Sequence, residues 1–211
     1  DEALRKSFFR GLRYPYITNT SPNKRHDGLN IVRAAYAVDS KIFKTETNQK
    51  GNAVMKLESL CKNNGIETSG AHSAIFDANL TKLLLEKIYR EQNATWRSAM
   101  LTSSRQETDD IVKKEKMFVL NEYFYGKSRL FLCCPLHPEF GMHPIYQWSL
   151  AYDLRHDVQP LLNLSTSELK LEMKKPPKFL RTIRSNKAPI ILHSDFAKKL
   201  EPYNAINPEI L

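Results

Sequence analysis

The hydrophobic pattern of this chain changes from a helical repeat to a strand-like repeat partway along, and this change constrains the fold most. Up to about Asn93, apolar residues recur at helical spacing, in segments 2–12, 27–38, 55–64 and the run after Ser73. From about Met117 short strand-like runs follow, at 117–125, 129–134, 146–154, 179–183 and 189–193. A capping-box pattern at 165–168 predicts one helix among these strands. We therefore expect a largely helical part over residues 1–93 and a small mixed or barrel-like part over 94–211.

The helix expected after Ser73 places a histidine and a carboxylate at its start. Ser73 is a suitable N-cap, and a packed face is predicted from the helical spacing of Phe76, Leu80, Leu83, Leu84 and Ile88. Asp77 follows Phe76, about 100° around the helix, so its carboxylate is expected at the margin of the buried face, where it could bind a metal. His72 lies just outside the helix and could point to the same spot. The alternative is a capping or surface role, because acidic residues favour helix starts electrostatically.

Charge favours a polyanionic partner. Thirty-two Lys and Arg against 23 Asp and Glu give a formal charge of +9. Residues 174–187 contain basic side chains and no acidic one, interleaved with apolar residues, which predicts a basic face on an ordered strand. The alternative is an ordinary solvated strand face. The candidates for binding in this stretch are Arg181, Arg184 and Lys187.

Composition excludes several other classes. With 211 residues and 41% hydrophobic content, the chain can form one large or two small domains with real cores. No apolar run is long enough to span a membrane and no signal-peptide layout is present, so we expect a soluble, cytoplasmic monomer. Cys61 and the adjacent Cys133 and Cys134 lack metal-ligand or redox spacing, which predicts reduced thiols and no zinc site.

Several segments, in order and spacing, resemble the bacterial exodeoxyribonuclease I family, which belongs to the DEDDh class of 3′ to 5′ exonucleases. The resemblance rests on segments 1–16, 27–37, 56–66, 71–78, 135–138, 152–154 and 160–162. It runs nearly from end to end. It implies that residues 1–93 are the C-terminal portion of a ribonuclease-H-like exonuclease domain. Residues 94–211 would be the SH3-like barrel domain that follows it.

The resemblance also implies roles for the acidic residues. Asp77 corresponds to the last metal-binding Asp of the family and His72 to the general base of two-metal phosphodiester hydrolysis, with Mg²⁺ or Mn²⁺ as the cofactor. Ser73 stands where the family usually has Asp. Aligning Arg5 and Phe8 without a gap makes Asp1 the second acidic residue of another motif, so Asp1 is a metal-ligand candidate, with a helix-start carboxylate as the alternative.

The family's first motif, Asp-x-Glu, would lie upstream of residue 1, and its helical C-terminal domain is not represented. The resemblance therefore implies an incomplete piece of the nuclease, which we expect to be inactive alone.

For binding, the resemblance adds Arg33, which matches a family arginine in a region that contacts DNA; an exposed helix charge is the alternative. The basic stretch would contact single-stranded DNA or the acidic C-terminal tail of single-stranded-DNA-binding protein, which the family recognises. Trp96, Tyr123 and Phe124 could stack on bases or belong to the core. His137, His143 and His156 lack ligand spacing.

The function expected is 3′ to 5′ degradation of single-stranded DNA. The alternative is a non-catalytic nucleic-acid or partner-binding module derived from such an enzyme. A structural role in a larger assembly comes third.

Overall fold

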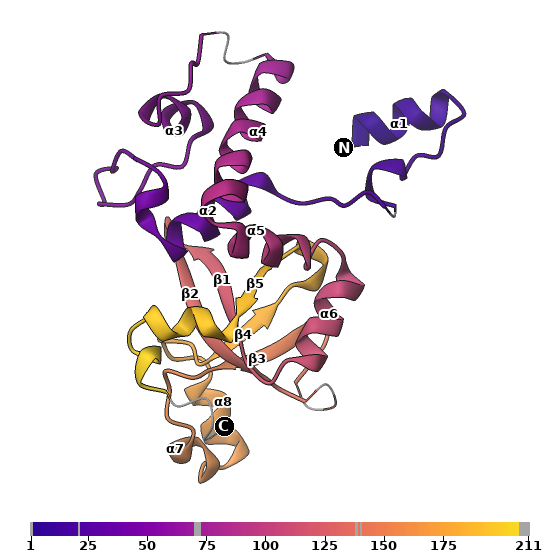
Figure 1. Cartoon of the computed structure of the whole chain (residues 1–211). Coiled ribbons are helices and arrows are strands. Elements are labelled where there is room, and N and C mark those ends of the chain that lie inside the picture. The colour runs from indigo at the N-terminus through magenta and orange to yellow at the C-terminus, as the bar shows by residue number, and fades with distance from the viewer. Residues whose placement is uncertain (1, 21, 70–72, 138, 140, 207–211) are drawn as a thin grey trace.

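The first part of the chain is helical, as predicted. The computed structural model describes residues 2–20, 22–69, 73–137, 139 and 141–206 (Figure 1). Its first helices are α1 (Glu2–Arg10), α2 (Gly28–Val38), α3 (Leu57–Asn63) and α4 (Ala74–Glu91). Two further helices, α5 (Asn93–Met100) and α6 (Arg105–Lys114), occupy a stretch for which the sequence pattern predicted no helix. Helix α6 includes Lys113 and Lys114 of the basic run at 113–116.

Helix α4 has the predicted cap and most of the predicted buried face. The Ser73 hydroxyl accepts a hydrogen bond from the Phe76 amide (3.2 Å), which satisfies one of the free N–H groups of the first turn. Leu80, Leu84 and Ile88 are buried. Leu83 was predicted to lie on this face but is 44% exposed, because the buried stripe of α4 is narrower than the sequence pattern suggested.

The second part forms one antiparallel sheet in the order β4-β3-β2-β1-β5. Its strands are β1 (Phe118–Phe124), β2 (Lys127–Pro135), β3 (Ser149–Asp153), β4 (Leu180–Ile183) and β5 (Ile190–His193). All five predicted strands are present. The third begins at Ser149 instead of Tyr146, because residues 143–148 fold into a hydrogen-bonded turn.

Apolar residues pack on both faces of the sheet because successive strand residues point to opposite sides. Val119 and Leu192 belong to a core with α2, α3, α4 and α5, whereas Phe118 and Phe131 pack with Val112 of α6. Figure 1 shows α2, α4 and α5 above the sheet and α6 beside it. The helical part and the sheet therefore share one hydrophobic core across residues 93 and 94.

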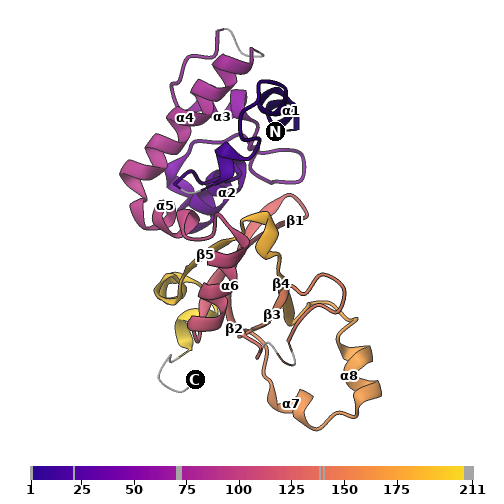
Figure 2. The ribbon, with the colours of Figure 1, turned by 90° about the vertical axis from the view of Figure 1, so that its right-hand side faces the viewer.

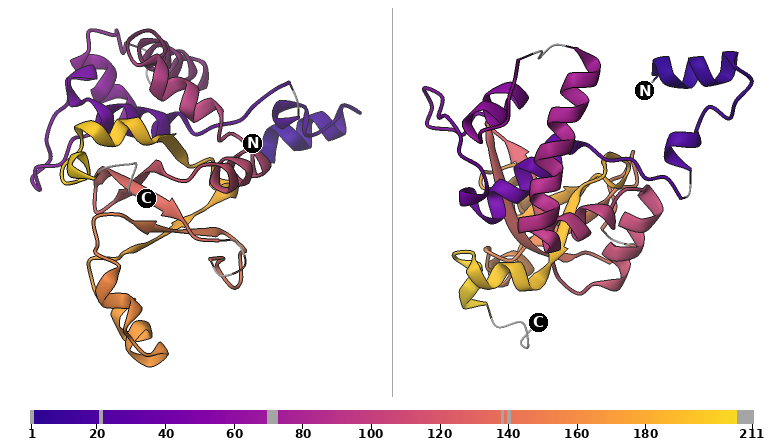
Figure 3. Two further views of the ribbon diagram at one scale, coloured as in Figure 1. Left: turned by 60° about the horizontal axis from the view of Figure 1, so that its bottom comes forward. Right: turned by 45° about the horizontal axis from the view of Figure 1, so that its top comes forward.

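Two helical segments project from this body (Figures 2 and 3). Helix α1 has no buried residue and lies apart from the remaining helices. Between β3 and β4 the chain forms α7 (Gln159–Leu162) and α8 (Thr166–Glu172), also without buried residues. The predicted capping box of α8 is confirmed, since Ser165 and Glu168 satisfy each other's backbone amides.

Short 3-10 turns complete the chain: Ile17–Asn19, Ser40–Ile42, Ser185–Lys187, Ser194–Lys199 and Tyr203–Ala205.

All three cysteines are free thiols, as expected, and burial raises the pKa of the Cys133 thiol. Among the described helices, none is long and apolar enough to cross a membrane.

Candidate nucleic-acid interface

Asp77 lies in the first turn of α4, close to the point where this helix meets the start of α2. The Asp77 side chain is half-buried, and the Asp77 carbonyl accepts a hydrogen bond from the Thr81 hydroxyl (2.8 Å). The Thr81 methyl group packs against Gly28 at the start of α2. The contact is so close that a Cβ added at Gly28 would lie only 3.2 Å from this methyl carbon. The two other predicted catalytic or metal residues, His72 and Asp1, lie outside the described residues.

The described residues do not form a metal centre by themselves. Mg²⁺ and Mn²⁺ prefer several oxygen ligands, and a tight site needs clustered carboxylates. Over the ranges that the structure describes, no group of three or more His, Cys, Asp and Glu is arranged to hold a metal ion. Asp77 alone does not provide such a site, so no catalytic step through a metal can be built from these residues.

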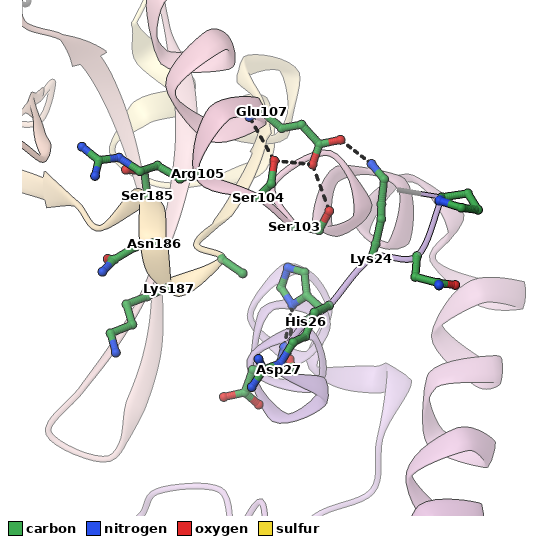
Figure 4. A pocket seen from close by; sticks show the side chains of 14 residues that line it. Lys24, His26, Asp27, Ser103, Ser104, Arg105, Glu107, Ser185, Asn186 and Lys187 are labelled. Atoms are coloured by element: carbon green, nitrogen blue, oxygen red, sulfur yellow. Dashed lines mark hydrogen bonds and ion pairs between the residues drawn. The ribbon is translucent and has the colours of Figure 1, made fainter. Parts of the chain in front are cut away.

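A polar cavity of about 790 Å³ lies between three segments that are distant in sequence (Figure 4). Residues 22–27 precede α2, residues 103–107 begin α6, and residues 185–188 follow β4. Its charged lining residues comprise four cations and two carboxylates: Lys24, Arg25, Arg105, Lys187, Asp27 and Glu107. Figure 4 shows Asn186 and Lys187 across the cavity from Lys24. The lining therefore carries a net positive charge suited to an anionic ligand.

Two helices begin at this cavity and add to its positive potential. Asp27 caps α2, accepting from the Leu29 amide (2.9 Å), and Ser104 caps α6, accepting from the Glu107 amide (3.2 Å). The N-terminus of a helix carries a partial positive charge and favours anions. The helix dipoles add to the cationic side chains around the cavity, and the carboxylates of Asp27 and Glu107 at the two helix starts offset part of this potential.

One wall is held by a hydrogen-bonded network around Glu107. Lys24 Nζ donates to Glu107 Oε1 (2.5 Å) and to the Met100 carbonyl (3.1 Å). The Ser103 and Ser104 hydroxyls donate to Glu107 Oε2 (3.0 and 2.9 Å). The Lys24 hydrogen bond is the main cause that lowers the pKa of Glu107, so this carboxylate is ionised at neutral pH. The network ties the segment before α2 to the start of α6.

His26 and Ser185 contribute less exposed polar groups. Burial is the main cause that lowers the pKa of His26, which keeps its imidazole neutral at pH 7, and its Nδ1 accepts from the Asp27 amide (3.0 Å). Ser185 is 1% exposed, and its hydroxyl has no hydrogen-bond partner among the described residues. A buried hydroxyl without a partner can donate to a ligand that enters the cavity.

Of the predicted binding residues, Lys187 lines this cavity and Arg184 lies just outside it. Both are exposed, and the Arg184 guanidinium lies 5.6 Å from the centre of the Trp148 ring. Arg33 lies in a different place, over the Tyr123 ring (3.6 Å), in a smaller cavity of about 210 Å³. The Arg33 Nε has no hydrogen-bond partner among the described residues. The fold thus separates Arg33 from the basic stretch.

Arg181 is a correction to the sequence-based prediction of a basic face. It is only 9% exposed, and its guanidinium donates to Glu122 and to Asp153 (both 3.1 Å) while it lies over the Phe131 ring (3.7 Å). Its charge is therefore neutralised inside the molecule. Arg181 is therefore a structural residue of the sheet and does not belong to the surface proposed to bind nucleic acid.

The three aromatic candidates divide between core and surface. Trp96 packs against the core beside Tyr89, and Phe124 stacks on Phe131. Tyr123 is exposed, and the Arg33 guanidinium lies over its ring.

Sequence reasoning missed three residues that line the cavity: Lys24, Arg105 and Ser185. The spacing of Ser104 and Glu107 was the available signal, because it predicts a capped helix start.

Comparison with known proteins identifies relatives of this chain in sequence and in structure. No family model matches the chain. It is 26% identical over 212 residues to exodeoxyribonuclease I of Haemophilus influenzae, which covers 99% of this chain and 45% of that protein. It is 27% identical over 177 residues to exodeoxyribonuclease I of Escherichia coli, covering 81% and 36%. The chain spans less than half the length of these relatives.

Solved structures show the same fold. The crystal structure of E. coli Exonuclease I in complex with a dA16 oligonucleotide has a TM-score of 0.68 at 24% identity, covering 97% of this chain and 46% of that one. The ExoI/SSB-Ct complex gives 0.67 at 23% identity, covering 97% and 46%.

The class of protein that this chain resembles in sequence and in fold is therefore the exodeoxyribonucleases. Within that class the similarity is to exodeoxyribonuclease I, and it extends over nearly the whole chain, which confirms the predicted resemblance.

Proposed function

We propose that the protein is an exodeoxyribonuclease that degrades single-stranded DNA from the 3′ end, and that this chain supplies part of its catalytic and DNA-binding surfaces. The observation that carries the proposal is the net-positive cavity at the N-termini of α2 and α6, which suits a phosphate backbone. Similarity to exodeoxyribonuclease I over 99% of the chain supports the same class of substrate.

In this proposal the cavity binds phosphates of the single strand. Lys187 and Arg105 supply charge, and the Ser185 hydroxyl adds a buried donor. Arg33 contacts the strand at a second point. Because most contacts are to phosphate, binding is expected to weaken steeply with salt and to depend little on base sequence.

The catalytic assignment follows the family resemblance. Asp77 is proposed as one ligand of a divalent cation, Mg²⁺ or Mn²⁺, with Asp1 as a second candidate and His72 as the general base. The zinc-bound form of the E. coli ExoI–ssDNA complex supports a metal in this class of enzyme. Two-metal hydrolysis needs more carboxylates than the described residues bring together. Residues 1–93 are proposed as ribonuclease-H-like and 94–211 as SH3-like.

The test is a change of Asp77 to Asn in the protein. We expect Asp77→Asn to slow release of nucleotides from a 5′-labelled single strand in Mg²⁺ by about 100-fold or more, while the affinity for the strand survives, because affinity comes mainly from phosphate contacts. His72→Ala should slow turnover and leave metal affinity intact, since a base is not a ligand. Turnover is followed on denaturing gels and affinity by fluorescence anisotropy.

Asp157→Asn is the matched control, because Asp157 is exposed and its Oδ1 only caps the Gln159 amide (3.0 Å). Near-normal turnover by Asp77→Asn would remove Asp77 from the site. Product ladders that shorten from the 5′ end would contradict the proposed direction.

A second candidate function is a non-catalytic module that binds nucleic acid or a partner protein. It is favoured because no group of three or more potential metal ligands is present in the described part of the chain. Salt-sensitive binding of single strands without turnover by the intact protein would support it. The proposed protein partner in either case is the C-terminal tail of single-stranded-DNA-binding protein, in keeping with the ExoI/SSB-Ct complex.

A further inference from the structure

The loop that joins β2 to β3 ends in a hydrogen-bonded turn. His143 N donates to the Trp148 carbonyl (2.7 Å), and Gln147 N donates to the His143 carbonyl (2.9 Å). At the base of the turn Leu150 N donates to the Gly141 carbonyl (2.7 Å). Gln147 has a φ of 51°, a left-handed conformation that few non-glycine residues adopt. These contacts hold the side chains of the turn in place before any ligand arrives, which lowers the entropic cost of binding.

The turn presents a stacked pair of aromatic rings. The ring centres of Tyr146 and Trp148 are 4.3 Å apart and their planes differ by 18°. The His143 ring lies 5.1 Å from Tyr146, and its Nδ1 accepts from the Ile145 amide (3.3 Å). Tyr146 is 55% exposed, so the stack ends in a ring that solvent reaches. A flat ring of a nucleobase can extend such a stack.

Arg184 connects this aromatic pair to the cation-rich cavity. Its guanidinium lies 5.6 Å from the centre of the Trp148 ring, and the next residues, Ser185 and Lys187, line the cavity. A single nucleic-acid strand alternates flat bases with phosphates, which matches an aromatic pair beside cations. An acidic peptide would use the cations but would leave the aromatic pair without a partner.

We propose that Tyr146 and Trp148 form a stacking platform for an unpaired base of a single DNA strand, whose phosphates pass over Arg184 and Lys187 into the cavity. This rests on the proposed function, in that the protein binds single-stranded DNA. It adds a site for base stacking on a loop to which the sequence pattern assigned no role.

The experiment uses the fluorescence of Trp148 in the 211-residue chain. The chain has two tryptophans, so Trp96→Phe leaves Trp148 as the only reporter. This variant is titrated with an oligothymidylate and with an abasic strand of the same length, which carries the same phosphates without bases. We expect oligothymidylate to quench Trp148 emission and the abasic strand to leave it unchanged. In the same background Tyr146→Ala should weaken oligothymidylate binding about tenfold and leave abasic binding unchanged.

Tyr146→Phe keeps the ring and should bind like the parent, whereas Tyr89→Ala, at another exposed tyrosine, is the matched control. Equal binding of both strands with constant Trp148 emission would overturn the platform and leave the proposed function standing. Failure of both strands to bind would overturn both. Quenching by the acidic tail peptide but not by DNA would assign the surface to a protein partner and overturn the platform.

Discussion

Arg184 precedes a short 3-10 turn and Lys187 ends it, yet their side chains meet different surroundings. Lys187 lines the cavity between α2 and α6, and Arg184 lies over Trp148. Both side chains are exposed. Single-stranded DNA and the acidic tail of single-stranded-DNA-binding protein would each offer them clustered negative charge. The two residues therefore allow DNA binding to be separated from recognition of the acidic tail.

Replacing Arg184 and Lys187 together by Ala is expected to weaken single-stranded DNA binding and to flatten its salt dependence. Each lost phosphate contact reduces the slope of log affinity against log salt by about 0.7 on single strands. Titrations at two salt concentrations measure this slope. Lys62→Ala with Lys170→Ala removes the same charge at exposed positions outside the basic stretch and should change neither quantity.

The same double variant tests the protein partner. If Arg184 and Lys187 bind the acidic tail of single-stranded-DNA-binding protein instead, DNA affinity should hold and binding of the tail peptide should be lost. Unchanged binding of both ligands would make the two residues an ordinary solvated face.

Arg181 shows why a basic stretch cannot be divided into binding and structural residues from sequence alone. In β4, Arg181 and Ile183 alternate with half-buried residues and so point to the interior together. The alternation of side chains along β4 could have indicated that Arg181 shares the inward face with Ile183. The carboxylates that make burial of Arg181 possible, Glu122 and Asp153, come from other strands, and no local pattern links them to it.

At the scale of elements, strands β3 and β4 and the C-terminal 3-10 turn meet at Asp153. Its side chain is fully buried, and its carboxylate accepts from Arg155 Nη2 (2.7 Å), Arg181 Nη2 (3.1 Å) and the Tyr203 hydroxyl (2.6 Å). Burial alone would raise the pKa of Asp153, but the hydrogen bonds from Arg155 and Tyr203 outweigh it and lower this pKa below 3.8. Burial raises the pKa of Glu122 against the opposing effect of Arg181.

Asp153→Asn is expected to destabilise the fold by about 3–5 kcal/mol at pH 7, because it leaves buried cations unpaired. The Asp153 pKa is lower in the folded than in the unfolded state, so its stabilisation is present well above pH 3.8 and lost as pH falls through the folded pKa. The difference in unfolding free energy between parent and variant should therefore shrink on acidification. Urea denaturation at a series of pH values measures it.

Glu122 titrates in the opposite sense. Its folded pKa is raised, so its contribution is greatest below pH 4.5 and is lost as pH rises. Because Asp153 is one of the causes that raise the pKa of Glu122, this contribution is smaller in the variant and offsets part of the change expected from Asp153. Asp157→Asn should behave like the parent at every pH, and a constant difference for Asp153→Asn would contradict the role given to Asp153.

At the scale of the whole molecule, the 211-residue chain is expected to bind single-stranded DNA but to show no significant exonuclease activity with Mg²⁺ or Mn²⁺. The reason is that the described residues bring no carboxylate cluster to Asp77. Release of nucleotides from a labelled strand measures activity, and anisotropy measures binding. Degradation that persists in Asp77→Asn and occurs equally in a mock preparation without the chain would indicate a contaminating nuclease. Robust degradation that Asp77→Asn abolishes would contradict the expectation.

Local patterns predicted the elements of this molecule better than the site. Hydrophobic periodicity and capping residues are local, so α2, α4, α8 and all five strands were predictable. The cavity was not, because it forms where residues 22–27, 103–107 and 185–188 meet. Only the fold brings these segments together, and Lys187 was the one cavity residue that charge patterning had indicated.

The pairing of the last strand with the first has a consequence for synthesis on the ribosome. Phe118–Asn121 of β1 pairs with Ile190–His193 of β5, so one edge of β1 waits for a partner that is translated much later. At roughly 5–20 residues per second this delay lasts several seconds. An apolar strand edge left open is a template for pairing with other chains. The nascent chain therefore needs protection from neighbouring chains until His193 has emerged, and a stop codon before β5 would release a product that aggregates.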